Sequence, residues 1–332
     1  IEPATLGFIS RLRQWTNRPA GERLRSELVR LLDLPGCSTW LRLMDETGVL
    51  TSLFEELEPA RQCALVYYGE GGVLTHSLDT AARADFLLRR LEEAFPGLGA
   101  RINAHLDARS GEGSALRPVL VLAALLHDVS KPETAREVEG RLRFFGHDTA
   151  GARRAAAILK RLRFSGAHID TVSAVVANHL RPGNLAGGPE ITDKAVYRFF
   201  RDLGEDAVSQ LLVCWADHAS YLKEADLLRN LKHASKDPES FDETKVQPAD
   251  ARKTIHHLQV IAYLLRRLFD TKRKAVPDSV IDGRDVMEAL SLKPGPKVGK
   301  LLEEVREAQA EGKIHSRQEA LAFLTNLAKD KN

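Results

Sequence analysis

The stretch VLVLAALLHDVSKP, from Val119 to Pro132, decides how this chain must fold. Its eight apolar residues run directly into His127 and Asp128, and Pro132 follows as a helix-ending residue. An apolar run of this length predicts a buried segment, because a membrane span needs about 20 such residues. The segment therefore carries an imidazole and a carboxylate to the core, where unpartnered polar groups cost several kcal/mol. A divalent metal ion is the partner that would require both residue types side by side.

Outward from this stretch, almost every segment has the pattern of a helix. Apolar residues recur at three- and four-residue spacing, and Ala, Leu, Arg and Glu dominate, which predicts an all-α fold. Polar or Pro/Gly-rich stretches at 133–142, 181–189 and 233–248 are expected to be irregular. The predicted helices cover 4–15, 21–32, 39–47, 53–67, 73–95, 149–164, 169–179, 192–203, 205–225 and 251–269, with two more within 283–328.

The cysteines bear on the compartment. Cys37, Cys63 and Cys214 are far apart and form no CxxC pair, which argues against a disulfide framework or a structural zinc site. The sequence contains no signal peptide and no apolar stretch of spanning length. We therefore predict a cytoplasmic protein with no membrane partner.

Further residues of the metal-ligand type lie in apolar surroundings. His76, His179 and Asp217 each lie in an apolar helical segment, and His147 precedes Asp148 at a loop-to-helix junction. Any one of them alone is explained as a hydrogen-bonded core residue. The ordered set is not, and Asp217 in particular directly follows six apolar residues. The set therefore predicts a divalent-metal site.

The order His76, His127-Asp128, Asp217 resembles the HD-domain superfamily of metal-dependent phosphohydrolases. The resemblance implies that these four residues bind one metal ion. His147 and His179 fall where some members hold a second ion, and are candidate ligands for it. Lys131 lies where the family places a phosphate-neutralising lysine, so Lys131 and Asp128 are the expected catalytic residues.

The ligand types indicate the chemistry. Imidazole and carboxylate together suit Mn, Fe, Co, Ni, Zn or Mg, as one or two ions, and do not choose among them. Such an ion generates hydroxide near neutral pH and binds a phosphoryl oxygen. Lys131 and Arg181 are candidates to bind the phosphate and neutralise its charge, and the alternative for each is a solvated surface cation.

The resemblance extends to both ends of the chain. The segments GERLRSELVRLL (Gly21–Leu32) and LRLMDETGVL (Leu41–Leu50) resemble the neck of the bacterial tRNA nucleotidyltransferases, the CCA-adding enzymes and poly(A) polymerases. The stretch Gly283–Leu324 is similar to the body and tail of that family, which grip tRNA. The resemblance implies a helical neck at 1–68, an HD domain at 69–232 and a tRNA-binding body and tail at 233–332.

One departure from that family concerns the nucleotidyl-transfer site. The family uses a Gly-Ser motif, an acidic metal-binding pair and a template-reading Glu-Asp-x-x-Arg, and we do not find this set of motifs in the 332 residues. Asp45-Glu46 is expected to be helix surface. We predict no nucleotidyl-transfer site in this chain, and the missing Met before Ile1 favours a fragment over a natural headless homologue.

Two basic groups are candidates for RNA contact. Arg153 and Arg154 follow His147, and Lys293, Lys297 and Lys300 flank the turn PGPKVG. A Pro-Gly turn that leads into a helix exposes backbone N–H groups, which suits a phosphate backbone. On charge alone a solubilising surface is the simpler explanation, and the resemblance shifts the tail lysines towards RNA.

We therefore predict a metal-dependent phosphodiesterase or phosphatase that acts on RNA ends or nucleotides. Relatives with the full ligand set are associated with 2′,3′-cyclic phosphodiesterase, 2′-nucleotidase and phosphatase activity. Two alternatives stay open: a non-catalytic tRNA-binding portion of a CCA-adding enzyme or poly(A) polymerase, and an HD hydrolase of free or cyclic nucleotides. The predicted partner is tRNA or another RNA, and the oligomeric state, a homodimer included, is not determined.

Overall fold

The computed structural model describes residues 1–109, 115–188, 190–270 and 275–330. Within these ranges the regular elements are helices apart from one two-stranded hairpin, so the predicted all-α fold is confirmed. The backbone forms two compact units, 1–186 with 208–263 and 187–207 with 264–332. The division at 68/69 and 232/233 stays a prediction.

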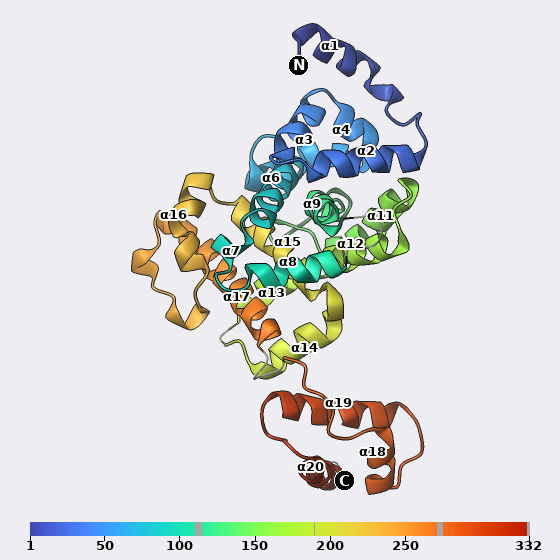
Figure 1. The fold of residues 1–332 in the computed structure, drawn as a ribbon, viewed down its shortest axis with the longest axis vertical. Coiled ribbons are helices and arrows are strands. Elements are labelled where there is room, and N and C mark those ends of the chain that lie inside the picture. Colours follow the sequence, from blue (N-terminus) through green and yellow to red (C-terminus); the bar gives the residue numbers. More distant parts are fainter. Residues whose placement is uncertain (110–114, 189, 271–274, 331–332) are drawn as a thin grey trace. The chain divides into compact units, whose positions relative to one another are not determined.

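The first unit contains most of the helices (Figure 1). They are α1 (Pro3–Leu12), α2 (Gly21–Asp33), α3 (Cys37–Glu46), α4 (Val49–Leu53), α5 (Leu65–Tyr68), α6 (Gly72–Leu88), α7 (Leu91–Ala94), α8 (Gly99–Ala108), α9 (Leu116–Leu126), α10 (Lys131–Thr134), α11 (His147–Arg161), α12 (Gly166–Asn178), α13 (Arg181–Ala186), α15 (Ala207–Ser220) and α16 (Glu224–Ala234). Helix α17 (Arg252–Phe269) belongs to the first unit up to Tyr263 and to the second from Leu264. Short 3₁₀ turns complete it: η1 (Arg13–Trp15), η2 (Glu55–Gln62), η4 (Pro238–Ser240), η5 (Glu243–Lys245) and η6 (Ala249–Ala251).

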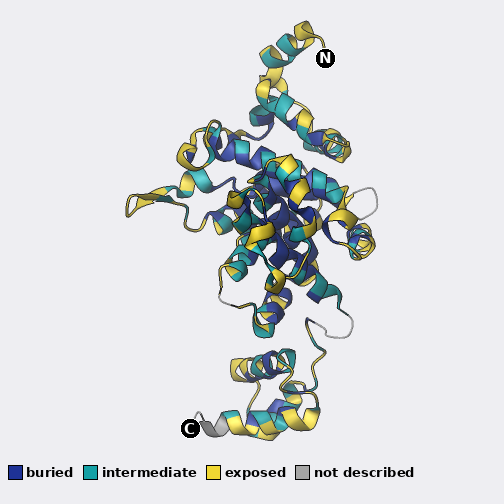
Figure 2. Ribbon diagram, turned by 90° about the vertical axis from the view of Figure 1, so that its left-hand side faces the viewer, coloured by how far each residue is buried: buried dark blue, intermediate teal, exposed yellow. Residues whose placement is uncertain are grey.

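Helix α9 forms the centre of the first unit. Every residue of α9 except Arg117 is buried, and α2, α6, α8, α11 and α12 all contact it. A helix that is apolar on all sides has to be surrounded by other helices. Figure 2 shows the buried residues gathered in the interior, whereas α1 has no buried residue. The core is thus built around the stretch that precedes His127.

The end of α9 differs from the prediction. We expected the helix to continue to about Pro132, but it ends at Leu126, and the chain turns before α10 begins at Lys131. Pro132 lies in the first turn of α10, where its missing N–H leaves no hydrogen bond unmade. His127 and Asp128 are therefore in a turn rather than on a helix face.

Two stretches that we expected to be irregular have regular structure. Residues 181–186 form α13, and the polar stretch contains β1 (Arg136–Val138) and β2 (Arg141–Arg143), which pair antiparallel. Glu139 and Gly140 both have positive φ, as a tight two-residue hairpin turn requires. The helix predicted at 205–225 is also divided, because α15 ends at Ser220 and α16 begins at Glu224.

The second unit has its own apolar core. It contains α14 (Asp193–Leu203), η3 (Gly204–Asp206), α18 (Gly283–Leu290), α19 (Pro296–Ala310) and α20 (Arg317–Asp330). The core includes Val286, Val305 and Leu324, all fully buried. Glu307 of α19 is buried and pairs with Lys194 and Arg198 of α14, at 2.7 Å and 2.5 Å. These ion pairs connect α14 to the C-terminal helices.

Among the described residues, no helix has both the length and the apolar character needed to cross a bilayer.

The thiols give a first testable prediction. Cys37, Cys63 and Cys214 are buried and free, and burial raises the pKa of each, that of Cys37 to about 12. Only the thiolate is a nucleophile, so little of it is present at pH 8. We expect native protein to react with Ellman's reagent at less than one thiol per chain over minutes, and guanidinium-unfolded protein to react at three. Rapid reaction of all three in native protein would contradict the burial.

Candidate metal centre

Six ligand-type side chains converge in the first unit from five different places in the chain. His76 lies on α6, His127 and Asp128 follow α9, and His147 begins α11. His179 follows the last residue of α12, and Asp217 lies on α15. Asp217 has a little solvent exposure, and the other five are buried. Most of these side chains stand at a helix end, where the chain can turn a side chain into the space between packed helices.

The six residues form two groups that could each hold a metal ion: His76, His127 and Asp217, and Asp128, His147 and His179. Within each group the ligand atoms all lie within 4.8 Å of one another. In the first group the Nε2 atom of His76 is 3.1 Å from Asp217 Oδ1. In the second the Nε2 atoms of His147 and His179 are 3.2 Å apart.

Asp128 stands between the two groups. Its Oδ2 atom is 3.5 Å from His76 Nε2 and 3.2 Å from His127 Nε2. Its Oδ1 atom is 3.4 Å from His147 Nε2 and 3.6 Å from His179 Nε2. One carboxylate thus offers an oxygen to each group.

Backbone carbonyls determine the tautomer of three of the histidines. The Nδ1 atoms of His127, His147 and His179 lie 2.7, 2.6 and 2.7 Å from the carbonyl oxygen three residues earlier in the chain. A carbonyl oxygen only accepts, so each Nδ1 must carry the proton and donate it. Nε2 of each is then the nitrogen that faces the cluster and is available to a metal ion.

His76 reaches the same state through a side chain. The Ser220 hydroxyl donates to the carbonyl oxygen of Asp217 at 2.7 Å and lies 3.2 Å from His76 Nδ1. With its only proton used in that bond, Ser220 Oγ accepts the Nδ1 proton of His76. Nδ1 of each of the four histidines is therefore hydrogen-bonded, and Nε2 of each is the nitrogen that faces the cluster.

The cluster leaves buried polar atoms without partners. Among the residues that the structure describes, His76 Nε2, His127 Nε2 and Asp128 Oδ1 are buried and find no hydrogen-bond partner. Each such atom costs about 1–3 kcal/mol when it is not satisfied. Imidazole nitrogens and carboxylate oxygens are a donor set that divalent first-row metals accept. The residues present therefore fit a divalent cation, and a cation would satisfy these atoms.

Lys131 is part of the cluster and is not a surface cation. Its Nζ atom is 2.5 Å from Asp128 Oδ2 and donates to the Tyr68 hydroxyl at 2.7 Å. Burial alone would lower the pKa of Lys131, but Asp128 and Tyr68 more than offset this, so the pKa is raised. The ammonium group stays charged at neutral pH beside the proposed ligands.

The carboxylates of the cluster are ionised. Burial would raise the pKa of both Asp128 and Asp217, but the surrounding histidines, and Lys131 for Asp128, outweigh it, so both pKa values are lowered. Burial raises the charging cost of His179 and lowers its pKa to about 4. At neutral pH the site therefore holds anionic carboxylates and a neutral His179, the protonation states that metal binding needs.

These shifts predict how stability depends on pH. Unfolding raises the His179 pKa from about 4 to its ordinary value of about 6.5, so between these pH values the unfolded chain binds a proton that the folded chain does not. Burial also lowers the pKa of His257 to about 4, so this residue likewise makes the folded protein less stable as the pH falls. Asp128 and Asp217 add a further loss of stability at lower pH, because their pKa values are lower in the folded protein than in the unfolded chain. His127 has the opposite effect on stability. Burial alone would lower its pKa, but Asp128 outweighs burial, so the pKa of His127 is raised in the folded protein.

We therefore expect the melting temperature of chelator-treated protein to fall steadily as the pH is lowered from 7 to 4.5. Differential scanning fluorimetry in EDTA measures it. A melting temperature that rises towards acid pH would contradict the assignment of neutral buried histidines.

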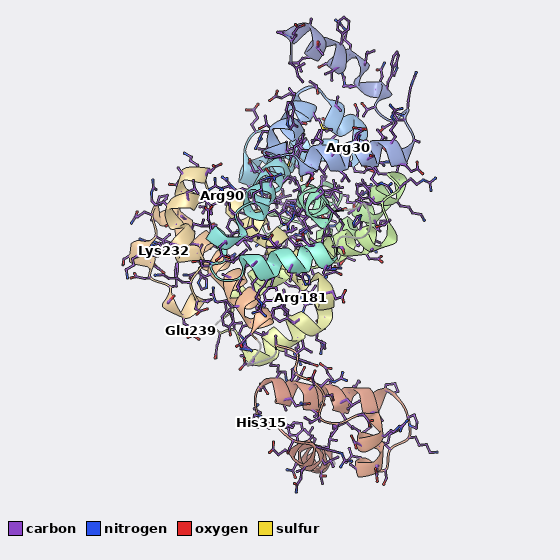
Figure 3. All side chains as sticks on the ribbon, viewed as in Figure 1. Arg30, Arg90, Arg181, Lys232, Glu239 and His315 are labelled. Carbon is purple, nitrogen blue, oxygen red and sulfur yellow. The ribbon has the colours of Figure 1, made fainter. Side chains whose placement is uncertain are left out.

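The remaining predicted residues are one arginine of α13, two arginines of α11 and three lysines of the second unit. Arg181 begins α13, two residues after His179, and is half-buried (Figure 3). Arg153 and Arg154 are exposed on α11, and Arg154 pairs with Glu133. Lys293, Lys297 and Lys300 are exposed in the second unit, where Lys293 precedes α19 and the other two lie within its first five residues.

The sequence analysis missed three side chains at the cluster. Ser220 orients His76, Tyr68 stacks on the His76 ring with centroids 4.7 Å apart, and Tyr221 lies 5.2 Å from the same ring. Ser220 follows Asp217 by one helical turn, which is a signal that could have been read. Tyr68 comes from α5, and nothing in its sequence position pointed to the site.

Comparison with known protein families gives two matches. Residues 73–222 match the family described as the HD domain. The chain contains an HD domain. Residues 1–61 match the family described as the probable RNA and SrmB-binding site of polymerase A. The HD domain contains all six clustered residues, and the second match covers most of the segment that resembles the neck.

Curated relatives extend the likeness over most of the chain. A CC-adding tRNA nucleotidyltransferase of Thermus thermophilus is 33% identical over 310 residues, which are 92% of this chain and 56% of that protein. An A-adding tRNA nucleotidyltransferase of Deinococcus radiodurans is 30% identical over 314 residues, 94% of this chain and 59% of that protein. The predicted resemblance to this family is confirmed, and the chain spans a little over half the length of these relatives.

A third relative is named for a different pair of activities. A bifunctional uridylyltransferase/uridylyl-removing enzyme of Ruegeria pomeroyi is 29% identical over 183 residues, 52% of this chain and 18% of that protein.

Proposed function

We propose that this chain is a metal-dependent phosphohydrolase that cleaves phosphoester bonds at RNA ends or in small nucleotides. The observation that supports this most directly is Asp128, whose two oxygens face two separate groups of ligand atoms while Lys131 lies 2.5 Å away. A structural ion has a closed set of ligands, whereas a catalytic ion keeps a position open for water or substrate. A cluster with a charged lysine at its edge suits an anionic substrate.

The residues of the cluster would hold one or two ions. His76, His127, Asp128 and Asp217 would bind the first, and Asp128, His147 and His179 the second. Mn, Fe, Co, Ni, Zn and Mg are the candidates. A bound divalent ion supplies Lewis acidity and lowers the pKa of a water molecule to near neutrality.

The chain's own residues supply the rest of the chemistry. The Lys131 ammonium group, held between Asp128 and Tyr68, would neutralise negative charge on the phosphoryl oxygens as the bond to phosphorus breaks. The four histidines keep their orientation because Nδ1 of each is hydrogen-bonded. Arg181 is proposed as a second phosphate contact.

The partner that we propose is tRNA or a similar RNA. The match of residues 1–61 to an RNA-binding family and the names of the tRNA nucleotidyltransferase relatives support it. In the second unit Lys293, Lys297 and Lys300 are exposed around the start of α19. Arg153 and Arg154 on α11 are the corresponding proposal in the first unit. A cytoplasmic location stays a prediction.

A second candidate function is a tRNA-binding portion whose HD domain is not catalytic. It is favoured by the relatives named above, two of which are named for nucleotide addition and not for hydrolysis. The uridylyl-removing relative favours hydrolysis, since removal of a nucleotidyl group breaks a phosphodiester bond.

Hydrolysis assays separate the two candidates. Purified protein is incubated with a 2′,3′-cyclic nucleotide, bis-p-nitrophenyl phosphate or a cyclic dinucleotide, each with added Mn²⁺, Co²⁺ or Ni²⁺, and tRNA binding is measured at several salt concentrations. We expect turnover of the 2′,3′-cyclic nucleotide with at least one metal. No turnover with any metal, together with salt-dependent tRNA binding, would favour the non-catalytic portion.

A further inference from the structure

An exposed aromatic side chain lies directly beside the buried cluster. Tyr221 is 55% exposed, yet its ring centroid is only 5.2 Å from that of His76, which is buried. Single exposed aromatic residues are common on protein surfaces, so exposure alone says little. The position of Tyr221, between solvent and a proposed metal ligand, is what requires an explanation.

Several contacts hold Tyr221 in place. Its backbone N–H donates to the His218 carbonyl oxygen at 3.3 Å, and Arg83 donates to the carbonyl oxygen of Leu222 at 2.7 Å. Its ring also packs beside that of His76, with the two ring planes inclined at 33°. A ring that is already fixed loses little entropy when a ligand packs on it.

Charge and aromatic surface meet at this point. Tyr221 and Tyr68 both pack against the ring of His76, and Tyr68 accepts a hydrogen bond from Lys131, which pairs with Asp128. A ligand that fits it needs an anionic group for Lys131 and the proposed metal ions, and a flat apolar group for Tyr221. A nucleotide has both, because its phosphate is anionic and its base has a π-face.

We propose that Tyr221 is the stacking platform for the base of the nucleotide whose phosphate the site hydrolyses. The inference rests on the proposed function and narrows its substrate to nucleotides with an unpaired base, because a base within a duplex has no free face. Stacking accepts every base, so the site would discriminate weakly among the four. Tyr221 would contribute to binding and not to the chemical step.

The experiment compares ligands with and without a base. Calorimetry measures binding of adenosine 2′-monophosphate and of ribose phosphate to wild type, Tyr221→Ala, Tyr221→Leu and Tyr221→Trp. We expect Tyr221→Ala and Tyr221→Leu to weaken nucleotide binding about 5- to 100-fold and to leave ribose phosphate binding unchanged. Tyr221→Trp should bind the nucleotide like wild type. Leucine keeps apolar bulk without a flat ring, so it serves if alanine disturbs the fold.

Kinetics provide the second readout. With a 2′,3′-cyclic nucleotide, Tyr221→Ala should raise KM by the same factor and change kcat little, whereas a base-free ribose cyclic phosphate should show no change. Tyr67→Ala is the matched control, because Tyr67 is 51% exposed and its hydroxyl bonds to Leu142, away from His76.

The outcomes distinguish the two proposals. If Tyr221→Ala and wild type bind the nucleotide equally and have the same KM, the proposed stacking role of Tyr221 is wrong. The proposed hydrolysis is not affected by that result. Wild type that hydrolyses neither substrate, with nucleotide binding that depends on Tyr221, would refute the hydrolase and leave the platform standing. Wild type that binds no nucleotide would overturn the platform.

Discussion

Replacing His127 and Asp128 together with alanine is expected to remove bound divalent metal and to lower kcat/KM for a phosphodiester by about 1000-fold or more. The variant deletes a ligand of the first group and the carboxylate whose oxygens face both groups. Metal-ion catalysis contributes several kcal/mol of transition-state stabilisation, and each 1.4 kcal/mol is about tenfold in rate. Metal content by plasma mass spectrometry and the initial rate measure the two effects.

Matched controls separate ligand loss from loss of a buried polar residue. His168→Gln and Asp85→Asn each change a buried residue of the same type in the first unit, outside the cluster. Both controls should retain the metal and the activity. Equal metal content in the double variant and wild type would refute the metal centre.

Thermal stability gives an independent readout of the same variant. A ligand that binds only the folded state stabilises it by about 4 kcal/mol at 1,000 times its dissociation constant. Chelation should therefore lower the melting temperature of wild type by several degrees and leave that of the double variant unchanged. A chelator effect of the same size in both proteins would show that the ion binds elsewhere.

Replacing Lys131 with methionine is expected to lower kcat by about 100- to 1000-fold while metal content stays at the wild-type level. Lys131 contacts Asp128 and Tyr68 and is the charged group best placed to meet a phosphoryl oxygen. Loss of one preorganised electrostatic contact to the transition state has effects of this size. Steady-state kinetics with the metal-loaded protein measure it.

Methionine preserves most of the length of the lysine side chain and removes the charge. Lys160→Met is the control, because Lys160 is exposed on α11 and should be neutral to activity. Lys131→Arg should not restore full activity, since a planar guanidinium does not replace a compact ammonium group held between two partners. If kcat is unchanged in Lys131→Met, Lys131 has no catalytic role and its ion pair with Asp128 is only structural.

The sequence predicted the fold class because the pattern of α9 leaves little choice. A helix that is apolar on all sides must be enclosed, and its neighbours then need one apolar face each, which the three- and four-residue spacing provides. The errors are local. The helix α13 and the hairpin at 136–143 were missed because short polar elements lack an apolar period, and the end of α9 was placed beyond Asp128 because Pro132 was taken as the helix end.

Sequence by itself therefore determined that polar residues of the metal-ligand type would be buried: His127 and Asp128 adjoin an apolar run, and Asp217 follows another. Which of those atoms meet was decided only by the tertiary structure. Asp128 divides its two oxygens between groups drawn from α6, α9, α11, α12 and α15, and Tyr68 reaches the site from α5. The physical reason is that burial follows from local composition, whereas distances between side chains on different helices depend on how those helices pack against one another.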